Sequence, residues 1–386
     1  MVQTLHRTES SANARLAADT LAMQATEGVP TWMLHVMDIA FLEYASGHPR
    51  GAYCADPDTV YLDFQRAAGV CMIDQYLADN PLTMTAHGYG HGTARGASTG
   101  AETIVLDGIT IDSPESVAAH LERFVFPPLV EEIAATNPDD EAAVTALIER
   151  ERAMQTRFGP SILKVPYGEA FQHFPYLRYT TYGYVDYLTA FLAYPELMEK
   201  DFALQADLAV KKNALAACAV AQGGLPKTLR LDHDMADGRG TLVDVRALDA
   251  LWFPHFERAI QPYLEAGIRL LWHCDGNLME MAPRLIDVGI GGFQGFQYED
   301  GMDYDRICRM RTRNGVPLLI WAGVSVTRTL PFGTPDDVRD ELNWLVRQGP
   351  RVGLFLGASS SITPGVKWEN LNALIEGLAY YRNHGR

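Results

Sequence analysis

Residues 267–278 read GIRLLWHCDGNL, an apolar run that ends in residues able to bind a metal, transfer protons or turn the chain. The run 268–272 has the length and the apolar character of a buried strand, and a helix is expected at 278–288. Alternation of strands with helices predicts a parallel sheet. The alternation continues to the end of the chain, with strand 291–298 before helix 304–314, strand 316–322 before helix 335–348, and strand 352–356 before helix 368–382.

These units predict an α/β fold of the (β/α)8 barrel (TIM barrel) type, in which catalytic groups lie in the loops after the carboxyl ends of the strands. We expect a helical N-terminal extension at 1–28, the barrel at 29–386 and a β-hairpin inserted at 86–112. His87 and His91 lie in the glycine-rich part of that insertion, where a flexible loop is expected and not a helical pair of metal ligands. An open, doubly wound sheet is the alternative, but it requires a glycine-rich phosphate-binding turn that the sequence lacks.

The chain is acidic, with 48 acidic and 32 basic residues and a formal net charge of -16. Because phosphates and anionic lipids bind to basic surfaces, neither nucleic acid nor a membrane is expected as a partner. The five cysteines form no CxxC pair, and residues 1–31 lack the apolar core of a signal peptide. These features predict a soluble protein of a reducing compartment, the cytoplasm.

Polar residues follow each of the C-terminal strands. His273 and Asp275 come after the first strand, Glu299 after the second, and Ser325 and Ser360 after the next two. Because barrel strands deliver their carboxyl ends to one face, we expect these side chains to share a site. His273, Asp275 and Glu299 together offer nitrogen and oxygen ligands for a divalent ion, or a proton-transfer pair. The alternative is that His273 only bonds a loop carbonyl at the end of its strand.

Two upstream segments supply further candidates. Asp74 follows an expected strand at 69–73, and His233 and Asp234 follow a strand that ends at 231. The segment 231–238, LDHDMADG, departs from a calcium loop because its glycine comes one position late and no glutamate closes the loop. A solvated turn rich in Asp and Gly is the alternative for this segment.

Four segments resemble the uroporphyrinogen decarboxylase superfamily, which includes the decarboxylase and the cobalamin-linked methyltransferases that demethylate methanol, methylamines or aryl ethers. The resemblance covers roughly residues 29 to 382, and the barrel fold that it implies agrees with the count of strand–helix units. The segments are VPTWMLHVMDIAFLEY (29–44), GIRLLWHCDGNLMEMAPRLIDVGIGGFQGFQYEDGMD (267–303), LPFGTPDDVRDELNWLV (330–346) and FLGASSSITPGVKWENLNALIEGL (355–378).

The resemblance distinguishes between branches of the superfamily. His35 and Ile39 stand where the decarboxylase carries two arginines for the carboxylates of its substrate, whereas Asp74 matches its central aspartate. Neither replacement can make the bidentate contact of an arginine. In the thiol-methylating branch, a His-x-Cys motif and a distal Cys hold zinc. Here Asp275 and Ser360 take the places of the two cysteines, which leaves a harder nitrogen and oxygen site.

The resemblance therefore implies a methyltransferase that moves a methyl group from a small O-methyl or N-methyl substrate to a corrinoid (cobalamin) on a partner protein, that is, O-demethylation or its nitrogen counterpart. A divalent metal, zinc in the first instance, or an acid cluster would activate the leaving group. The alternatives are a metal-free decarboxylase (a lyase) acting on uroporphyrinogen or a related carboxylated substrate, and a non-catalytic ligand-binding barrel. The resemblance also implies a homodimer.

Roles for the candidate residues follow from this interpretation. The candidate metal ligands are His273, Asp275 and Glu299. The candidate catalytic residues are Asp74, His233, Asp234 and Asp275. The candidate substrate-binding residues are His35, Tyr182, Asn277 and Ser360. Cys274 alternates with His273 along the strand, and we expect it to be a small buried apolar side chain.

Overall fold

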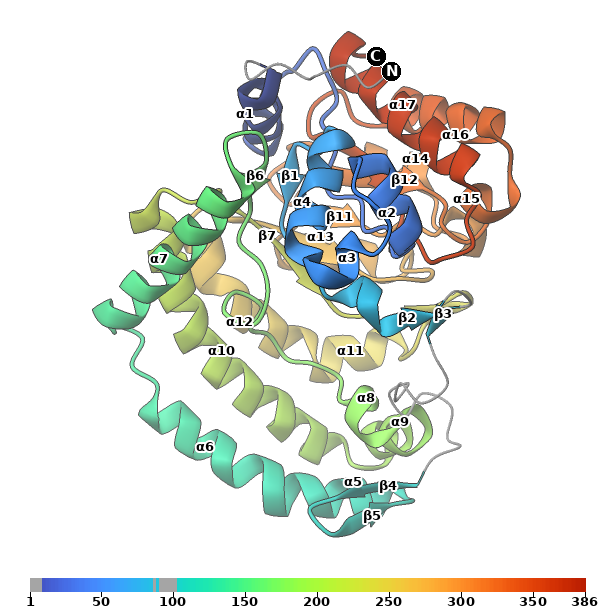
Figure 1. Ribbon diagram of the computed structural model, residues 1–386. Coiled ribbons are helices and arrows are strands. Elements are labelled where there is room, and N and C mark those ends of the chain that lie inside the picture. The colour runs from blue at the N-terminus through green and yellow to red at the C-terminus, as the bar shows by residue number, and fades with distance from the viewer. Residues whose placement is uncertain (1–8, 86–87, 90–102) are drawn as a thin grey trace.

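A computed structural model of the chain describes residues 9–85, 88–89 and 103–386 (Figure 1). His87, His91 and most of the inserted segment lie outside these residues. The main sheet is parallel, and its almost wholly buried strands are of the kind expected between two layers of helices. In spatial order these strands are β13 (Leu354–Ala358), β12 (Leu319–Val324), β11 (Ile290–Gln294), β10 (Arg269–His273) and β7 (Thr228–Asp232).

Short strands extend this sheet beyond β13. Trp32 N donates to Leu356 O at 3.1 Å, and Cys71 N donates to Thr31 O at 2.8 Å, so the backbone at 31–32 lies between β13 and β1 (Met72–Ile73). β1 pairs in parallel with β6 (Leu163–Lys164). Among the described residues no ladder joins β6 to β7, so the structure shows a parallel α/β sheet, and closure of the predicted barrel stays a prediction.

Helices follow the C-terminal strands in the predicted order. α13 (Ala282–Val288) comes after β10, α14 (Tyr304–Arg309) after β11, α16 (Pro335–Gln348) after β12 and α17 (Trp368–His384) after β13. The start of α16 is a capping box, in which Asp337 N donates to Thr334 Oγ1 at 3.3 Å and Thr334 N donates to Asp337 Oδ2 at 2.8 Å. The prediction of four successive strand–helix units is confirmed.

A second group of helices lies beside the sheet (Figure 1). α10 (Pro195–Gly223) contacts α12 (Phe253–Glu265), α7 (Glu141–Phe158) and α6 (Phe126–Ala135). The described chain begins with α1 (Glu9–Leu21). An antiparallel hairpin of β4 (Ile104–Leu106) and β5 (Ile109–Ile111) precedes the helices of the second group in the sequence. No helix of the described residues is both long and apolar enough to cross a membrane.

The remaining elements are short. They are α2 (Ile39–Ser46), α3 (Ala52–Ala55), α4 (Pro57–Ala67), β2 (Met84–Thr85), β3 (Gly88–Tyr89), α5 (Pro114–His120), α8 (Tyr179–Tyr182), α9 (Tyr184–Ala193), β8 (Ala236–Asp237), β9 (Gly240–Thr241), α11 (Val245–Leu251), α15 (Thr329–Phe332), a π-helical turn (Leu121–Val125) and two 3-10 turns (Asn80–Thr83 and Tyr298–Asp300).

Candidate functional site

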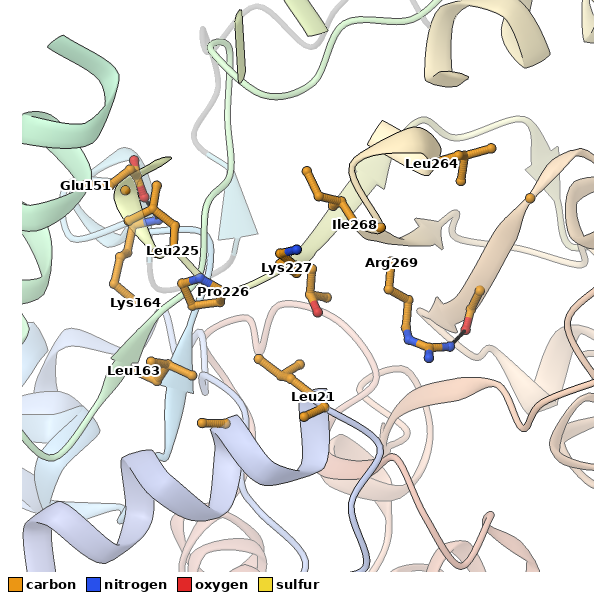
Figure 2. A pocket seen from close by; sticks show the side chains of 18 of the residues that line it. Leu21, Glu151, Leu163, Lys164, Leu225, Pro226, Lys227, Leu264, Ile268 and Arg269 are labelled. Carbon is orange, nitrogen blue, oxygen red and sulfur yellow. Dashed lines mark hydrogen bonds and ion pairs between the residues drawn. The ribbon is translucent and has the colours of Figure 1, made fainter. Parts of the chain in front are cut away.

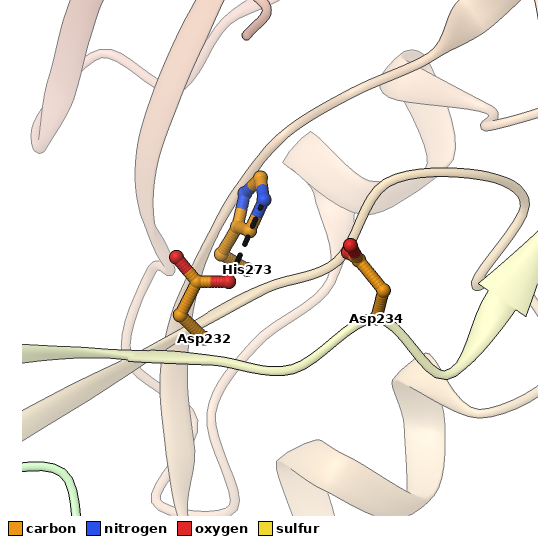
Figure 3. A group of neighbouring side chains, drawn as sticks. All are labelled: Asp232, Asp234 and His273. Carbon is orange, nitrogen blue, oxygen red and sulfur yellow. Dashed lines mark ion pairs between the residues drawn. The ribbon is translucent and has the colours of Figure 1, made fainter. Parts of the chain in front are cut away.

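Asp232, Asp234 and His273 form one group of possible metal ligands, which we call the carboxylate–imidazole cluster. One ligand atom from each residue lies within 4.8 Å of the others. Asp232 and His273 are the last residues of β7 and β10 and are partners in the register of these two strands, and Asp234 follows in the loop after β7. Figure 3 shows both carboxyl groups facing the imidazole. The neighbouring carboxyl ends of two parallel strands thus build the cluster.

The charge on His273 depends on the carboxylates around it. Nε2 lies 3.7 Å from Asp232 Oδ1 and 3.9 Å from Asp275 Oδ1. Burial disfavours the imidazolium, but the carboxylates of Asp232, Asp275 and Asp234 outweigh burial and raise the pKa of His273 above its ordinary value. The opposite nitrogen, Nδ1, has no hydrogen-bond partner among the described residues. Nε2 is therefore the nitrogen that faces the negative charge.

Gly295 packs against the other side of the imidazole. Its φ is +83°, and a Cβ placed there would lie 2.5 Å from Nδ1 of His273 and 3.3 Å from Cys274 O. A side chain at this position would be strained in its backbone and would collide with the ring. Close approach of the glycine backbone therefore holds the imidazole in its orientation toward Asp232.

The loop after β10 positions Asp234. The backbone N–H of Asp275 donates to Asp234 Oδ1 at 2.8 Å, and Tyr179 Oη donates to Asp234 O at 2.5 Å. Burial raises the pKa of Asp234, and the neighbouring Asp275 adds to this effect against the opposing influence of His273. Asp275 Oδ1 is buried and accepts no hydrogen bond within the described part of the chain. Two carboxyl groups beside the imidazole thus keep oxygens free for a ligand.

A buried arginine joins the cluster to Asp74. Arg230 Nε donates to Asp74 Oδ2 at 2.7 Å, Nη1 donates to Asp232 Oδ2 at 2.9 Å, and Nη2 donates to Gln75 Oε1 at 2.9 Å. The side chains of Arg230 and Asp74 are 3% and 0% exposed. Tyr167 Oη also donates to Asp232 Oδ2, at 2.8 Å, and its ring lies 4.6 Å from the guanidinium carbon. Burial opposes ionisation of Asp232, but His273 and Arg230 outweigh it and lower the pKa of that carboxyl.

Glu299, predicted to be a metal ligand, does not belong to the carboxylate–imidazole cluster. Its Oε1 accepts a hydrogen bond from Ser325 Oγ at 2.7 Å and another from Thr327 Oγ1, and Arg328 Nη2 reaches its backbone oxygen. The structure therefore brings His273 and Asp275 near one another but uses Glu299 to hold the loop after β12.

Two predicted histidines are buried and bond to groups outside the cluster. His233 Nε2 accepts from Leu177 N at 3.0 Å, and burial lowers the pKa of His233 to about 4. His35 lies 3.2 Å from Tyr61 Oη and 3.1 Å from Asn80 Nδ2, and burial lowers its pKa to about 4 as well. Both imidazoles are neutral at pH 7 and use ring nitrogens to join parts of the fold.

The other predicted residues have separate surroundings. Tyr182 Oη lies 2.9 Å from His120 Nδ1, in a fully buried position beside α5. Asn277 Oδ1 accepts from Met279 N at 3.2 Å and so stabilises the turn after β10. Ser360 is half-buried just after β13. Cys274 is buried as predicted, and its Sγ accepts from Met235 N at 3.2 Å.

Sequence reasoning missed Asp232, Arg230 and Tyr167. Asp232 escaped notice because the strand was expected to end at 231, one residue too early. Arg230 carried a usable signal, since a charged residue within the apolar run TLRLD must find a partner when the strand is buried. Tyr167 comes from a loop after β6, and no local pattern links it to β7.

Comparison with known proteins shows similarity at the level of the fold. No family model matches the chain, and no curated protein matches it significantly. A solved methyltransferase from Methanosarcina mazei is similar over 96% of this chain and 98% of its own, with a TM-score of 0.53 and 14% identity. A B12-independent methionine synthase from Shewanella sp. W3-18-1, in complex with selenomethionine, is similar over 62% of this chain and 66% of its own, with a TM-score of 0.33 and 17% identity.

The similarity to the Methanosarcina protein extends over nearly the whole of both chains, so the two share a fold. The resemblance predicted from the sequence is confirmed at this level.

Proposed function

We propose that this chain is a methyltransferase that moves a methyl group from a small O-methyl or N-methyl substrate to a corrinoid on a partner protein. The observation that carries the proposal is the carboxylate–imidazole cluster at the carboxyl ends of β7 and β10, where α/β barrels hold their reactive groups. A fold shared with a methyltransferase supports it. We also propose that residues 29–386 form a closed (β/α)8 barrel with an extension at 1–28 and an insertion at 86–112, and that the protein is a homodimer.

The cluster fits a divalent ion. It offers two carboxylates and one imidazole nitrogen within 4.8 Å, the hard nitrogen and oxygen donors that zinc accepts. Asp232, Asp234 and His273 would hold the ion, and the unpartnered Oδ1 of Asp275 is a further donor on the same side. Such an ion supplies Lewis-acid activation of the oxygen or nitrogen that loses the methyl group.

The protein's own groups orient the substrate and handle its proton. Arg230 and Tyr167 hold Asp232 in one orientation through hydrogen bonds to the same carboxylate oxygen. Asp234 is held through Oδ1, so Oδ2 is the oxygen free to carry a proton. Where no ion is bound, burial raises the pKa of Asp234, and it is then the carboxyl best suited to protonate a leaving alkoxide or amine.

A metal-free decarboxylase is the second candidate, and Asp74 favours it. Asp74 Oδ1 is buried and accepts no hydrogen bond among the described residues, as expected of a carboxylate that waits for the N–H groups of a substrate. Against it, His35 is buried and neutral where the decarboxylase has an arginine. This candidate predicts activity after removal of metal and a strict need for Asp74.

Methyl transfer to free cob(I)alamin tests the proposal. The purified chain is incubated with a panel of methyl ethers, methanol and methylamines, and formation of methylcobalamin is followed by absorbance. We expect substrate-dependent methylation that falls at least a hundredfold in His273→Gln, on the scale of losing a group from a catalytic site. His48→Gln is the matched control, because His48 pairs with Asp63 at the surface.

The alternatives make different predictions in the same assays. If chelator-treated protein releases CO₂ from uroporphyrinogen, and Asp74→Asn abolishes this release, the chain is a decarboxylase and not a methyltransferase. Ligand binding without either reaction would leave a non-catalytic barrel.

A further inference from the structure

A cavity of about 880 Å³ lies at the opposite end of the sheet from the carboxylate–imidazole cluster, and we call it the basal cavity. Thr228 and Arg269, the first residues of β7 and β10, line it, whereas Asp232 and His273 end the same strands. Four residue steps along a strand separate the two sites by roughly 13 Å. The volume is in the range of small-molecule pockets.

Positive charge is concentrated in the basal cavity, although the chain as a whole carries a net charge of -16. Of the described residues that line the cavity, one is a carboxylate, Glu151, and it is already paired with Lys164, with Oε2 and Nζ 2.9 Å apart. The charges of this ion pair cancel, so no carboxylate of the lining is left for the other cations. The basic residues of the lining are Arg152, Lys164, Lys227, Arg269 and Arg313.

Backbone carbonyl groups at helix ends compensate only part of this positive charge. Lys227 Nζ reaches Ala266 O at 3.4 Å, just after α12, and Arg152 Nη2 reaches Gly223 O at 3.3 Å, at the end of α10. Cations are favoured at such ends by the helix dipole. Arg269 differs, because it extends from a strand and is half-buried.

Within the described part of the chain, Arg269 has no counter-charge. Its one hydrogen-bond partner among the described residues is Gly291 O, at a long 3.4 Å, and burial lowers its pKa with no carboxylate to oppose the effect. Figure 2 shows Arg269 and Lys227 apart from the Glu151–Lys164 pair, with Leu21 of α1 nearby. A partly desolvated guanidinium without an anion is unfavourable, and a bound anion would relieve this cost.

Apart from the polar Gln155, Thr228, Thr312 and Asn314, the rest of the lining is apolar or glycine. It includes Leu21 of α1, Leu163 of β6, Leu225 before β7, Ile268 before β10 and Ile290 of β11. Apolar walls with a few convergent polar groups select ligands that have both an apolar body and a charged end.

We propose that the basal cavity binds an amphiphilic anion, with a carboxylate or phosphate group at Arg269 and Lys227 and an aliphatic or aromatic body against the apolar wall. The site is independent of the carboxylate–imidazole cluster, so the inference does not rest on the proposed methyl transfer. Because α/β barrels hold their reactive groups at the carboxyl ends of the strands, we expect a cavity at the amino ends to bind its ligand without converting it.

Calorimetric titration of the full chain with octanoate tests this inference, with octanol as the uncharged probe. We expect saturable octanoate binding and at least tenfold weaker binding of octanol. Arg269→Gln should weaken octanoate binding about tenfold, the usual effect of losing one charge-assisted hydrogen bond. Arg246→Gln is the matched control, because that guanidinium is 91% exposed and pairs with Asp244 outside the cavity.

A second variant guards against loss of folding. Ala22 is exposed and lines the basal cavity, so Ala22→Glu introduces a competing carboxylate without disturbing the core and should abolish octanoate binding. Circular dichroism establishes that each variant is folded. Absence of saturable octanoate binding to the wild-type chain, equal binding of octanol, or unchanged affinity in Arg269→Gln and Ala22→Glu would overturn the inference.

Discussion

Removal of Asp74 should leave the buried positive charge of Arg230 only partly compensated. Arg230 is 3% exposed, and its shortest hydrogen bond is the 2.7 Å contact from Nε to Asp74 Oδ2. Breaking a buried ion pair by removing one partner costs roughly 3–5 kcal/mol. Because Asp232 at 2.9 Å keeps part of the charge compensated, we expect Asp74→Ala to lower the free energy of unfolding by about 3 kcal/mol, at the low end of that range.

Urea unfolding followed by circular dichroism measures this loss. The dependence of the free energy on urea should be unchanged, so that the midpoint alone moves. Asp336→Ala is the control, since Asp336 is 89% exposed and its pair with Arg339 is a surface contact of small worth. A loss in Asp74→Ala no larger than in Asp336→Ala would refute the view that Asp74 compensates a buried arginine.

Two further predictions concern the imidazole. The folded state raises the pKa of His273 above the ordinary 6.5, so in metal-free protein its protonation stabilises the fold below pH 6.5 and this contribution is lost as the pH rises through the folded pKa. Urea midpoints between pH 5.5 and 8.5, roughly the range in which histidine titrates, should therefore fall more steeply in the wild type than in His273→Gln; parallel profiles would contradict the carboxylate–imidazole geometry. Gly295→Ala should destabilise the chain by more than about 1 kcal/mol, because its φ is +83° and the new Cβ would meet Nδ1 of His273. The same unfolding assay checks this, and a neutral substitution would show that the ring is free to move.

The C-terminal half of the sheet was predictable because each of its strands is a compact apolar run with a polar or glycine-rich end. Helix starts such as Thr334-Pro335 also carry their own local signal. Strand ends were less well predicted. The strand expected at 291–298 stops at Gln294, because Gly295 takes a positive φ and turns a still apolar segment out of the sheet.

The candidate site was predicted in part, because parallel strands bring their carboxyl ends together. His273 ends β10 and Asp234 follows β7, so their proximity follows from the parallel pairing of these two strands. The role of Glu299 depends on where Ser325 and Thr327 come to lie, and no local pattern specifies that contact. The early strands β1 and β6 have two residues each and gave little periodicity to detect.

The most direct test of the account is the metal content of the full chain, purified without chelators, in the wild type and three variants. The carboxylate–imidazole cluster predicts about one divalent ion per chain in the wild type, in His48→Gln and in Glu299→Gln, and its loss in His273→Gln. Zinc titration of chelator-treated protein should give the same order. An ion that persists in His273→Gln, or one that is lost in Glu299→Gln, would contradict the assignment of this cluster as the metal centre.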